Sequence, residues 1–247
     1  MYGFQKKFLQ GTKHIVFDVS HIISKSNIMK FNQQGYNSQR IFDPQANLLY
    51  LFSTDMKMPA FYRVLPGNIS GMKSLKLAIK EAGLSSCLVV GDKGFYSASN
   101  VEKLEEGKLR YILPMKRNRS YADYSRLKSR EYSKTYYGHY KYQKRSIYYF
   151  TYELERRNCI MFYDQTLYRE EADDYMLQIH EGKEGYSIES FEERQLTFGT
   201  FLVITNMSNP APEEVYKRME LETMFDELKN IIEADYSYMQ SDESFKA

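Results

Sequence analysis

The sequence is poor in the residues that mark several common protein classes. Among its 247 residues are two cysteines, four histidines and no tryptophan. Cys87 and Cys159 are too few and too far apart in the sequence to indicate a disulfide framework. Neither the cysteines nor the histidines show the spacing of a zinc site. Both thiols are therefore expected to be small buried side chains of a protein in a reducing cytosol.

Long apolar runs and glycine-rich loops are also missing. No run approaches the roughly 18 apolar residues of a membrane span, and the first residues, MYGFQKKF, lack the apolar region of a signal peptide. We therefore expect a cytoplasmic protein without a membrane partner. No glycine-rich phosphate-binding loop is present. A hydrophobic content of 43% with 27% charged residues is typical of a globular chain, long enough for one elaborated domain or two.

Charge is distributed unevenly along the chain, although the net charge is only +2. The basic segment, residues 108–145, holds twelve Lys and Arg, two acids and eight tyrosines. Cations among rings that can stack on bases are typical of a nucleic-acid surface, although a solvated basic face with tyrosines half-buried in strands fits the composition too. Residues 170–194 hold nine acids against Lys183 and Arg194. That acidic stretch would repel DNA, so we expect it to face away from DNA or to close against the basic segment.

The first half of the chain predicts a mixed α/β fold. Three strands, a helix, a strand, a helix and a strand follow one another, at residues 15–18, 47–53, 60–65, 70–83, 87–90, 100–109 and 110–114. The first three strands are expected to be consecutive and antiparallel. Asp18 lies on the first strand and Asp92 just after the fourth. Carboxylates at strand ends of an open α/β sheet converge where such sheets bind ligands.

The second half is richer in strands. Apolar and aromatic runs predict hairpins over 136–153, a strand over 157–164, a helix over 168–181 and a final strand over 198–205.

A helix predicted over residues 213–232 carries the remaining candidate residues. At about 100° per residue, Arg218, Glu222 and Lys229 fall within roughly 40° of one another, beside a continuous apolar arc. The two cations stand roughly 16 Å apart along the axis, a spacing that suits successive phosphates of a DNA strand, with a metal at the carboxylate between them. Alternatively, these are ordinary charged residues bordering an amphipathic helix, with Arg218 and Glu222 paired at i, i+4.

Four motifs together resemble the DDE transposases of bacterial and archaeal insertion sequences, in the subgroup with a β-rich insertion. They are FDVSHI around Asp18, PGNISG after the third strand, VVGDKGFYS around Asp92 and KRMELETMFDELK around Glu222. The last contains the Arg-x3-Glu-x6-Lys spacing of that subgroup's Tyr-Arg-Glu-Lys signature. The resemblance covers residue 13 to the end of the chain.

The resemblance implies a ribonuclease-H-like α/β sheet flanked by helices, interrupted by the insertion between the second Asp and the Glu-bearing helix. The expected divisions are 1–115 for the first part of the core, 116–205 for the mainly β-rich insertion, and 206–247 for the Glu-bearing helix and a truncated C-terminus. The last strand of the insertion belongs either to the insertion or to the core.

The resemblance also assigns roles. Asp18, Asp92 and Glu222 match the catalytic carboxylates that bind two Mg²⁺ ions, for which Mn²⁺ can substitute. The expected reaction is hydrolysis at transposon ends followed by strand transfer, performed by a homodimer on double-stranded DNA. The candidate DNA-binding residues are Arg218, Lys229, Tyr216, Lys93, Lys116, Arg117 and Arg119.

Two departures from the family pattern keep alternatives open. Val215 stands where the signature has tyrosine, with Tyr216 one position later, and Met219 stands where an aromatic commonly follows the arginine. A truncated, inactive fragment that only binds DNA or a full-length partner is therefore a second hypothesis. An unrelated α/β protein whose acids are structural is the third.

Overall fold

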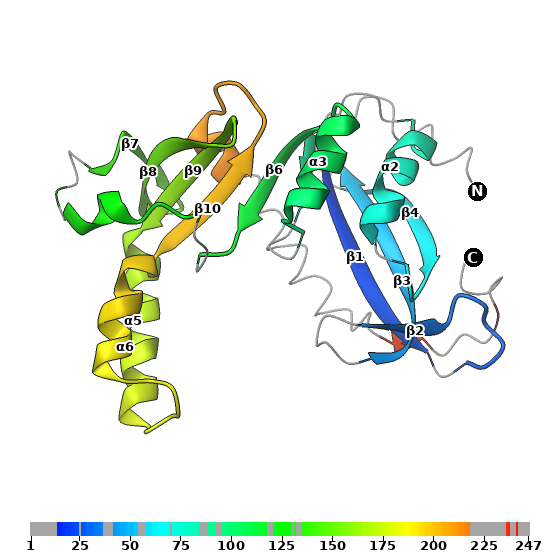
Figure 1. Cartoon of the computed structure of the whole chain (residues 1–247), viewed down its shortest axis with the longest axis horizontal. Coiled ribbons are helices and arrows are strands. Elements are labelled where there is room, and N and C mark those ends of the chain that lie inside the picture. Colours follow the sequence, from blue (N-terminus) through cyan, green and yellow to red (C-terminus); the bar gives the residue numbers. More distant parts are fainter. Residues whose placement is uncertain are drawn as a thin grey trace. The chain divides into compact units, whose positions relative to one another are not determined.

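The computed structural model describes most of the chain, drawn in Figure 1. The described residues are 14–24, 26–36, 42–53, 58–69, 71–83, 88–91, 95–117, 121–129, 131, 135–217, 236–237 and 241. The chain divides into two compact units. Unit 1 comprises Met1–Ile112 and Lys217–Ala247, and unit 2 comprises Leu113–Tyr216.

Unit 1 begins with an antiparallel group of strands. Strand β1 (His14–Ser24) pairs with β3 (Phe42–Ser53), which pairs with β4 (Met58–Pro66). The predicted antiparallel pairing of these three strands is thus confirmed, although they are not consecutive in the sequence. A short strand, β2 (Gln33–Tyr36), also pairs with the start of β3 and was not predicted. Its sequence QQGY lacks the apolar alternation that indicates a strand.

The other side of β1 carries the parallel part of the same sheet. Strand β5 (Leu88–Val90) pairs in parallel with β1 and with β6 (Arg110–Met115). Helices α2 (Gly71–Glu81) and α3 (Ala98–Glu106) connect these strands. All three residues of β5 are buried, as expected for a strand covered on both faces. A two-residue strand, β11 (Tyr236–Ser237), pairs with the end of β1.

Unit 2 contains an antiparallel sheet in the order β7–β8–β9–β10. These strands are Gly138–Tyr142, Arg145–Leu154, Arg157–Asp164 and Thr200–Thr205. Two-residue turns at Gln143–Lys144 and Glu155–Arg156 join the first three strands, and all four turn residues have positive φ. Such turns match the twist of paired strands, so the predicted hairpins are confirmed.

A helical arm, residues 165–197, connects β9 to β10. It comprises α5 (Gln165–His180), α6 (Ile188–Arg194) and the 3₁₀ turn η2 (Gln195–Thr197). In Figure 1, α5 and α6 lie side by side and extend beyond the strands of unit 2. Helix α5 was predicted and α6 was not. A further 3₁₀ turn, η1 (Ser125–Ser129), precedes β7.

The fold is therefore mixed α/β, as the sequence predicted. Within the described residues, no helix has the length and apolar character needed to cross a membrane.

Candidate active site and DNA-binding surface

The first candidate acid lies in the middle of the unit 1 sheet. The backbone of Asp18 belongs to β1, where it is paired with Tyr50 of β3. Two residues earlier on the same strand, Val16 is paired in parallel with Val90 of β5. Pairing on both sides fixes the backbone of β1 here, while the side chain of Asp18 lies outside the described part of the chain.

Gly91 and Phe95, the nearest described residues before and after Asp92, both contact this sheet. Before it, the Gly91 amide donates to the Ile112 carbonyl of β6 at 3.3 Å. After it, the buried Phe95 ring meets Phe17 of β1 edge-on, with the ring centroids 4.9 Å apart. Phe17 directly precedes Asp18, so Phe95, three residues after Asp92, packs against the strand that carries the first acid. Asp92 itself lies outside the described residues.

Helix α3 holds the end of this segment in place. The Asn100 side chain donates to the Phe95 carbonyl at 2.7 Å, and the Ser97 hydroxyl caps the helix by accepting from the Asn100 amide. The described residues of the motif VVGDKGFYS therefore end a buried strand at Val90 and reach the N-cap of α3 at Ser97. Gly94 and Phe95 match the small-then-aromatic pattern of the resemblance, and of these the structure describes Phe95.

The start of the predicted C-terminal helix is present. Residues 212–217 are helical, and the Val215 amide donates to the Ala211 carbonyl at 3.0 Å. The later candidates on that helix, Arg218, Glu222 and Lys229, lie outside the described residues, as do Lys93 and Arg119. Among the described side chains, no three His, Cys, Asp or Glu residues are grouped to hold a metal ion. The proposed metal-binding acids are not among these side chains.

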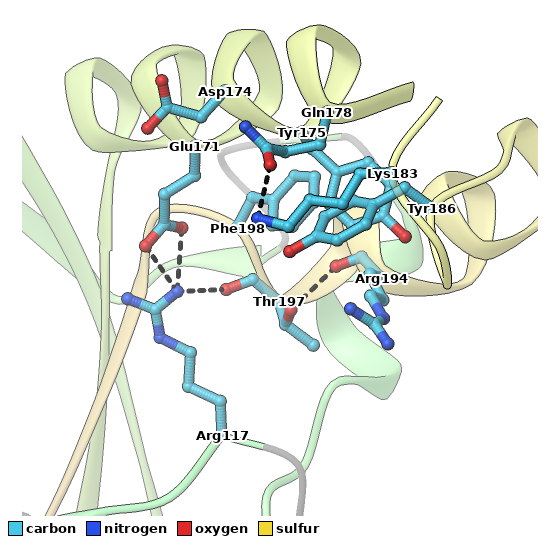
Figure 2. Close-up of a pocket in the computed structure, with 10 residues that line it drawn as sticks. All are labelled: Arg117, Glu171, Asp174, Tyr175, Gln178, Lys183, Tyr186, Arg194, Thr197 and Phe198. Atoms are coloured by element: carbon cyan, nitrogen blue, oxygen red, sulfur yellow. Dashed lines mark hydrogen bonds and ion pairs between the residues drawn. The ribbon is translucent and has the colours of Figure 1, made fainter. Parts of the chain in front are cut away.

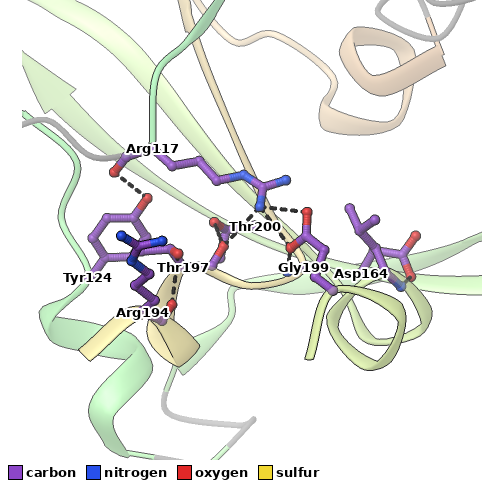
Figure 3. A network of polar contacts seen from close by, with 9 residues as sticks. Arg117, Tyr124, Asp164, Arg194, Thr197, Gly199 and Thr200 are labelled. Atoms are coloured by element: carbon purple, nitrogen blue, oxygen red, sulfur yellow. Dashed lines mark hydrogen bonds and ion pairs between the residues drawn. The ribbon is translucent and has the colours of Figure 1, made fainter. Parts of the chain in front are cut away.

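Arg117 is engaged within unit 2, as Figure 3 shows. Its Nη1 lies 2.7 and 2.8 Å from the two carboxylate oxygens of Glu171 on α5, and 3.4 Å from the Thr197 carbonyl. The same carboxylate accepts the Gly199 amide at 2.7 Å. Lys116, by contrast, is exposed. The two neighbouring candidates for DNA contact therefore differ, because only Lys116 presents its charge fully to solvent.

Tyr124 completes this network. Its hydroxyl donates to the Arg117 carbonyl at 2.7 Å. Burial raises the pKa of the Tyr124 phenol above its ordinary value, and a hydrogen bond with Thr200 and the Arg117 charge partly oppose that rise. The phenol is thus neutral at physiological pH and keeps the proton that it donates to the Arg117 carbonyl.

Tyr216 is buried in the aromatic core of unit 2, with 8% of its surface exposed. Its ring packs edge-on against four others, with centroid distances of 5.2 to 6.2 Å, in Tyr140, Tyr142, Phe162 and Phe201. Packing accounts for this position, and a contact with a DNA phosphate remains a prediction.

A pocket of about 600 Å³ opens beside the arm of unit 2 (Figure 2). Its lining mixes both charges with aromatic rings. Lys183 donates to Gln178 at 2.6 Å, and the Arg194 guanidinium lies 5.7 Å from the Tyr175 ring centroid. Asp174 and the Arg117–Glu171 ion pair also line the pocket. The mixed lining selects neither an anion nor a cation.

The polar anchors of the arm were missed by the sequence interpretation. Asp164 caps α5 by accepting from the amides of Thr166 and Leu167, and it also pairs with Arg145 at 2.8 Å. An aspartate immediately before a helical pattern is a recognised start signal and could have revealed the cap. No local sequence pattern indicates the ion pairs of Arg145 with Asp164 and of Arg117 with Glu171, because the partners are 19 and 54 residues apart in the sequence.

Comparison with known proteins places these observations in a family. No curated protein matches the chain significantly. Among solved structures, a piggyBac transposase in a cryo-EM synaptic complex with hairpin DNA is similar, with 10% identity and a TM-score of 0.46. The match covers 84% of this chain and 36% of that one, so this chain spans about a third of that protein. The family model described as Transposase DDE domain matches residues 9–235, and the chain therefore belongs to the transposase DDE domain family.

Proposed function

We propose that this chain is the catalytic core of a DNA transposase that cuts phosphodiesters at transposon ends and joins the freed 3′-hydroxyl to target DNA. The observation that carries the proposal is the parallel register of β1 and β5, in which Val16 lies opposite Val90. Two further residues along each strand lead to Asp18 and Asp92. Neighbouring strands lie about 4.8 Å apart, so a continued register would bring the two acids together.

The order of the strands supports a ribonuclease-H-like core. Three antiparallel strands precede two parallel ones, and the spatial order is β4–β3–β1–β5–β6, with β1 in the centre. Unit 2 falls between Asp92 and Glu222 in the sequence, which is where the family resemblance expects the insertion. The helical start at 212–217 leads toward Glu222 as the third acid.

The donor set fits divalent cations. Asp18, Asp92 and Glu222 offer only carboxylate oxygens, which Mg²⁺ and Mn²⁺ prefer. Two such charges about 4 Å apart repel by roughly 4 kcal/mol at an effective dielectric near 20, so the converged acids take up either cations or a proton. When bound, two metal ions would favour ionisation of the attacking water or 3′-hydroxyl and stabilise the leaving oxygen.

The remaining proposed residues position DNA. Arg218 and Lys229, on the same side of the predicted helix as Glu222, would neutralise phosphates on either side of the scissile bond. Hydrolysis and strand transfer then need the same alignment with different nucleophiles, and no histidine base is required. We propose double-stranded DNA as substrate and a homodimer as the form that brings two transposon ends together.

A nicking assay tests the proposal. The wild-type chain with Mn²⁺ is expected to convert supercoiled plasmid to the nicked form, and Asp92→Asn is expected to abolish that conversion. Glu102→Gln, an exposed change on α3, serves as the matched control and is expected to retain activity. Equal nicking by the wild type and Asp92→Asn would reject the assignment of this acid.

A second candidate, DNA binding without turnover, is favoured by one observation. Val215 stands at the tyrosine position of the signature and has no hydroxyl. The nearby Tyr216 has one, but its ring is buried and not exposed to DNA. If the wild type and Asp92→Asn both bind DNA with a steep salt dependence and neither nicks it, this second function is the correct one.

A further inference from the structure

The helical arm of unit 2 buries little of its own surface. Helix α5 runs for 16 residues and Tyr175 is its single buried residue, while α6 has none. Most helical stability in proteins comes from packing an apolar face. Within the arm and the residue after it, the rings of Tyr175, Tyr186, Phe191 and Phe198 pack together. Tyr168 links this group to β9, because its ring contacts both Phe198 and Tyr163. On the side of α5 away from Tyr175, the side chains of Asp173, Met176, Leu177 and His180 are exposed.

The base of the arm is nevertheless held firmly. Asp164 caps α5 and pairs with Arg145, and Glu171 joins Arg117 to the Gly199 amide. A Ser187–Ser190 capping box fixes the start of α6. A helical pair that is well anchored and yet buries little presents a fixed outer surface.

That outer surface is acidic and partly apolar. Asp173, Met176, Leu177 and His180 share one side of α5 because they are three, four and seven residues apart. Met176 and Leu177 are 43% and 50% exposed. Across the arm, most of the acids make no ion pair with any residue that the structure describes: Glu170, Asp173, Asp174, Glu181, Glu184, Glu192 and Glu193. Such a face repels DNA and favours a cationic partner with some apolar surface.

The chain itself carries a face of that complementary kind. Tyr137, just before the edge strand β7 of unit 2, and His139 and Lys141 on that strand are exposed at alternate positions, and Lys144 follows in the turn. Tyr137 is 61% exposed, and the Arg126 guanidinium lies 4.5 Å from its ring centroid. We call these four residues the basic edge. Lys141 and Lys144 form no ion pair with the described residues.

We propose that the outer face of the arm binds the basic edge of a second copy of this chain. Asp173 would meet Lys141 or Lys144, and Met176 and Leu177 would pack against Tyr137. In Figure 1 the arm extends away from β7 within unit 2, so one chain does not make this contact with itself. Each copy has one arm and one edge, and two reciprocal contacts close a two-fold dimer. The inference rests on the proposed function in one respect, because it names the surface of the proposed homodimer.

Sedimentation velocity of the full chain without DNA tests the surface. The wild type is expected to dimerise, more weakly at high salt because the contact is ionic. Asp173→Lys and Lys141→Glu are each expected to raise the dimer Kd about tenfold or more, since like charges then face each other. The double variant restores opposite charges and is expected to recover most of the affinity. Glu102→Lys on α3 changes the charge by the same amount in unit 1, at a residue that belongs to neither face, and should leave the Kd unchanged.

The outcomes separate this surface from catalysis. Thermal melts confirm that each variant is folded before its Kd is compared. A chain that stays monomeric at every concentration, or a dimer whose Kd neither reversal changes, overturns the proposal. A Lys141→Glu variant that loses DNA affinity while its dimer Kd is unchanged assigns the edge to DNA and also overturns it. Plasmid nicking is scored independently, so an intact dimer that fails to nick rejects the proposed function and leaves this surface standing.

Discussion

Adjacent residues of one basic segment take different roles in unit 2. Lys116 is exposed, whereas the side chain of Arg117 is 23% exposed and shares Glu171 with the Gly199 amide. A guanidinium that already neutralises a carboxylate has little charge left for a phosphate. The structure therefore favours an anchoring role for Arg117, although composition alone grouped it with the DNA-binding candidates.

Truncation of each neighbour is expected to separate these roles. Arg117→Ala leaves the half-buried Glu171 carboxylate without its cation and should lower the free energy of unfolding by about 1–2 kcal/mol, a value reduced for partial exposure. Lys116→Ala should change that free energy by less than about 0.5 kcal/mol. Urea titration followed by circular dichroism measures both. Equal losses in the two variants would contradict the anchoring role.

Cys159 is expected to be unreactive in the folded chain. Burial raises the pKa of its thiol from 9.0 to about 12, so the thiolate fraction at pH 8 falls about a thousandfold. The raised pKa also contributes stability that is present at neutral pH and is lost as the pH rises toward 12. Iodoacetamide labelling, read by mass spectrometry of the Cys159 peptide, should be slow in the native chain and fast in urea. Rapid labelling of the native chain would show that the Cys159 thiol becomes exposed to solvent without unfolding.

At the scale of elements, the joint between the arm and β10 depends on a glycine. Gly199 has φ +67°, and a Cβ there would lie 2.5 Å from the Asp164 carbonyl and 2.7 Å from Tyr168 Cβ. Its carbonyl accepts the Asp164 amide, and its own amide donates to Glu171. The close approach of two backbones allows no side chain at this position.

A pair of glycines with the same φ isolates that effect. Gly182 also has φ +67°, but a Cβ there meets no atom within 4 Å. Gly182→Ala should cost about 1 kcal/mol from backbone strain alone, whereas Gly199→Ala should cost about 2 kcal/mol or more beyond that, because the base of the arm must shift. Denaturant midpoints provide the comparison. Similar losses would mean that the joint relaxes without cost.

The sequence predicted some elements better than others, and the difference follows how much of each element is buried. The apolar runs Leu88–Val90 and Ile15–Phe17 predicted their strands, because burial on both faces leaves a local signal. The prediction over residues 15–18 covered only part of β1, which extends to Ser24. Strand β2 and helix α6 bury little, so no periodicity marks them. The Arg117–Glu171 pair joins residues 54 apart and depends on the fold. Of the candidate site, the sequence predicted the strand that carries Asp18 and the helix after Asp92, but not the Ser97 cap of that helix.

At the scale of the whole molecule, a net charge of +2 gives little general attraction to DNA. DNA binding must therefore depend on local clusters of Lys and Arg side chains that face solvent. The structure divides the basic segment accordingly, since some cations are exposed and others, such as Arg117 and Arg145, pair with acids of unit 2. The acidic arm lowers the net charge of unit 2 without cancelling those exposed lysines.

The salt dependence of DNA binding is expected to report this division. Each phosphate contact contributes about 0.9 to the slope of log K against log salt concentration. Lys116→Gln and Arg119→Gln should each flatten the slope by about that amount, whereas Lys103→Gln, on the exposed side of α3, should leave it unchanged. Arg117→Gln should lower stability with little effect on the slope, because its charge is already matched by Glu171. Fluorescence anisotropy with labelled duplex DNA measures the slopes. If neither Lys116→Gln nor Arg119→Gln changes the slope, the basic segment does not contact DNA phosphates, and the cations of unit 1 become the candidates.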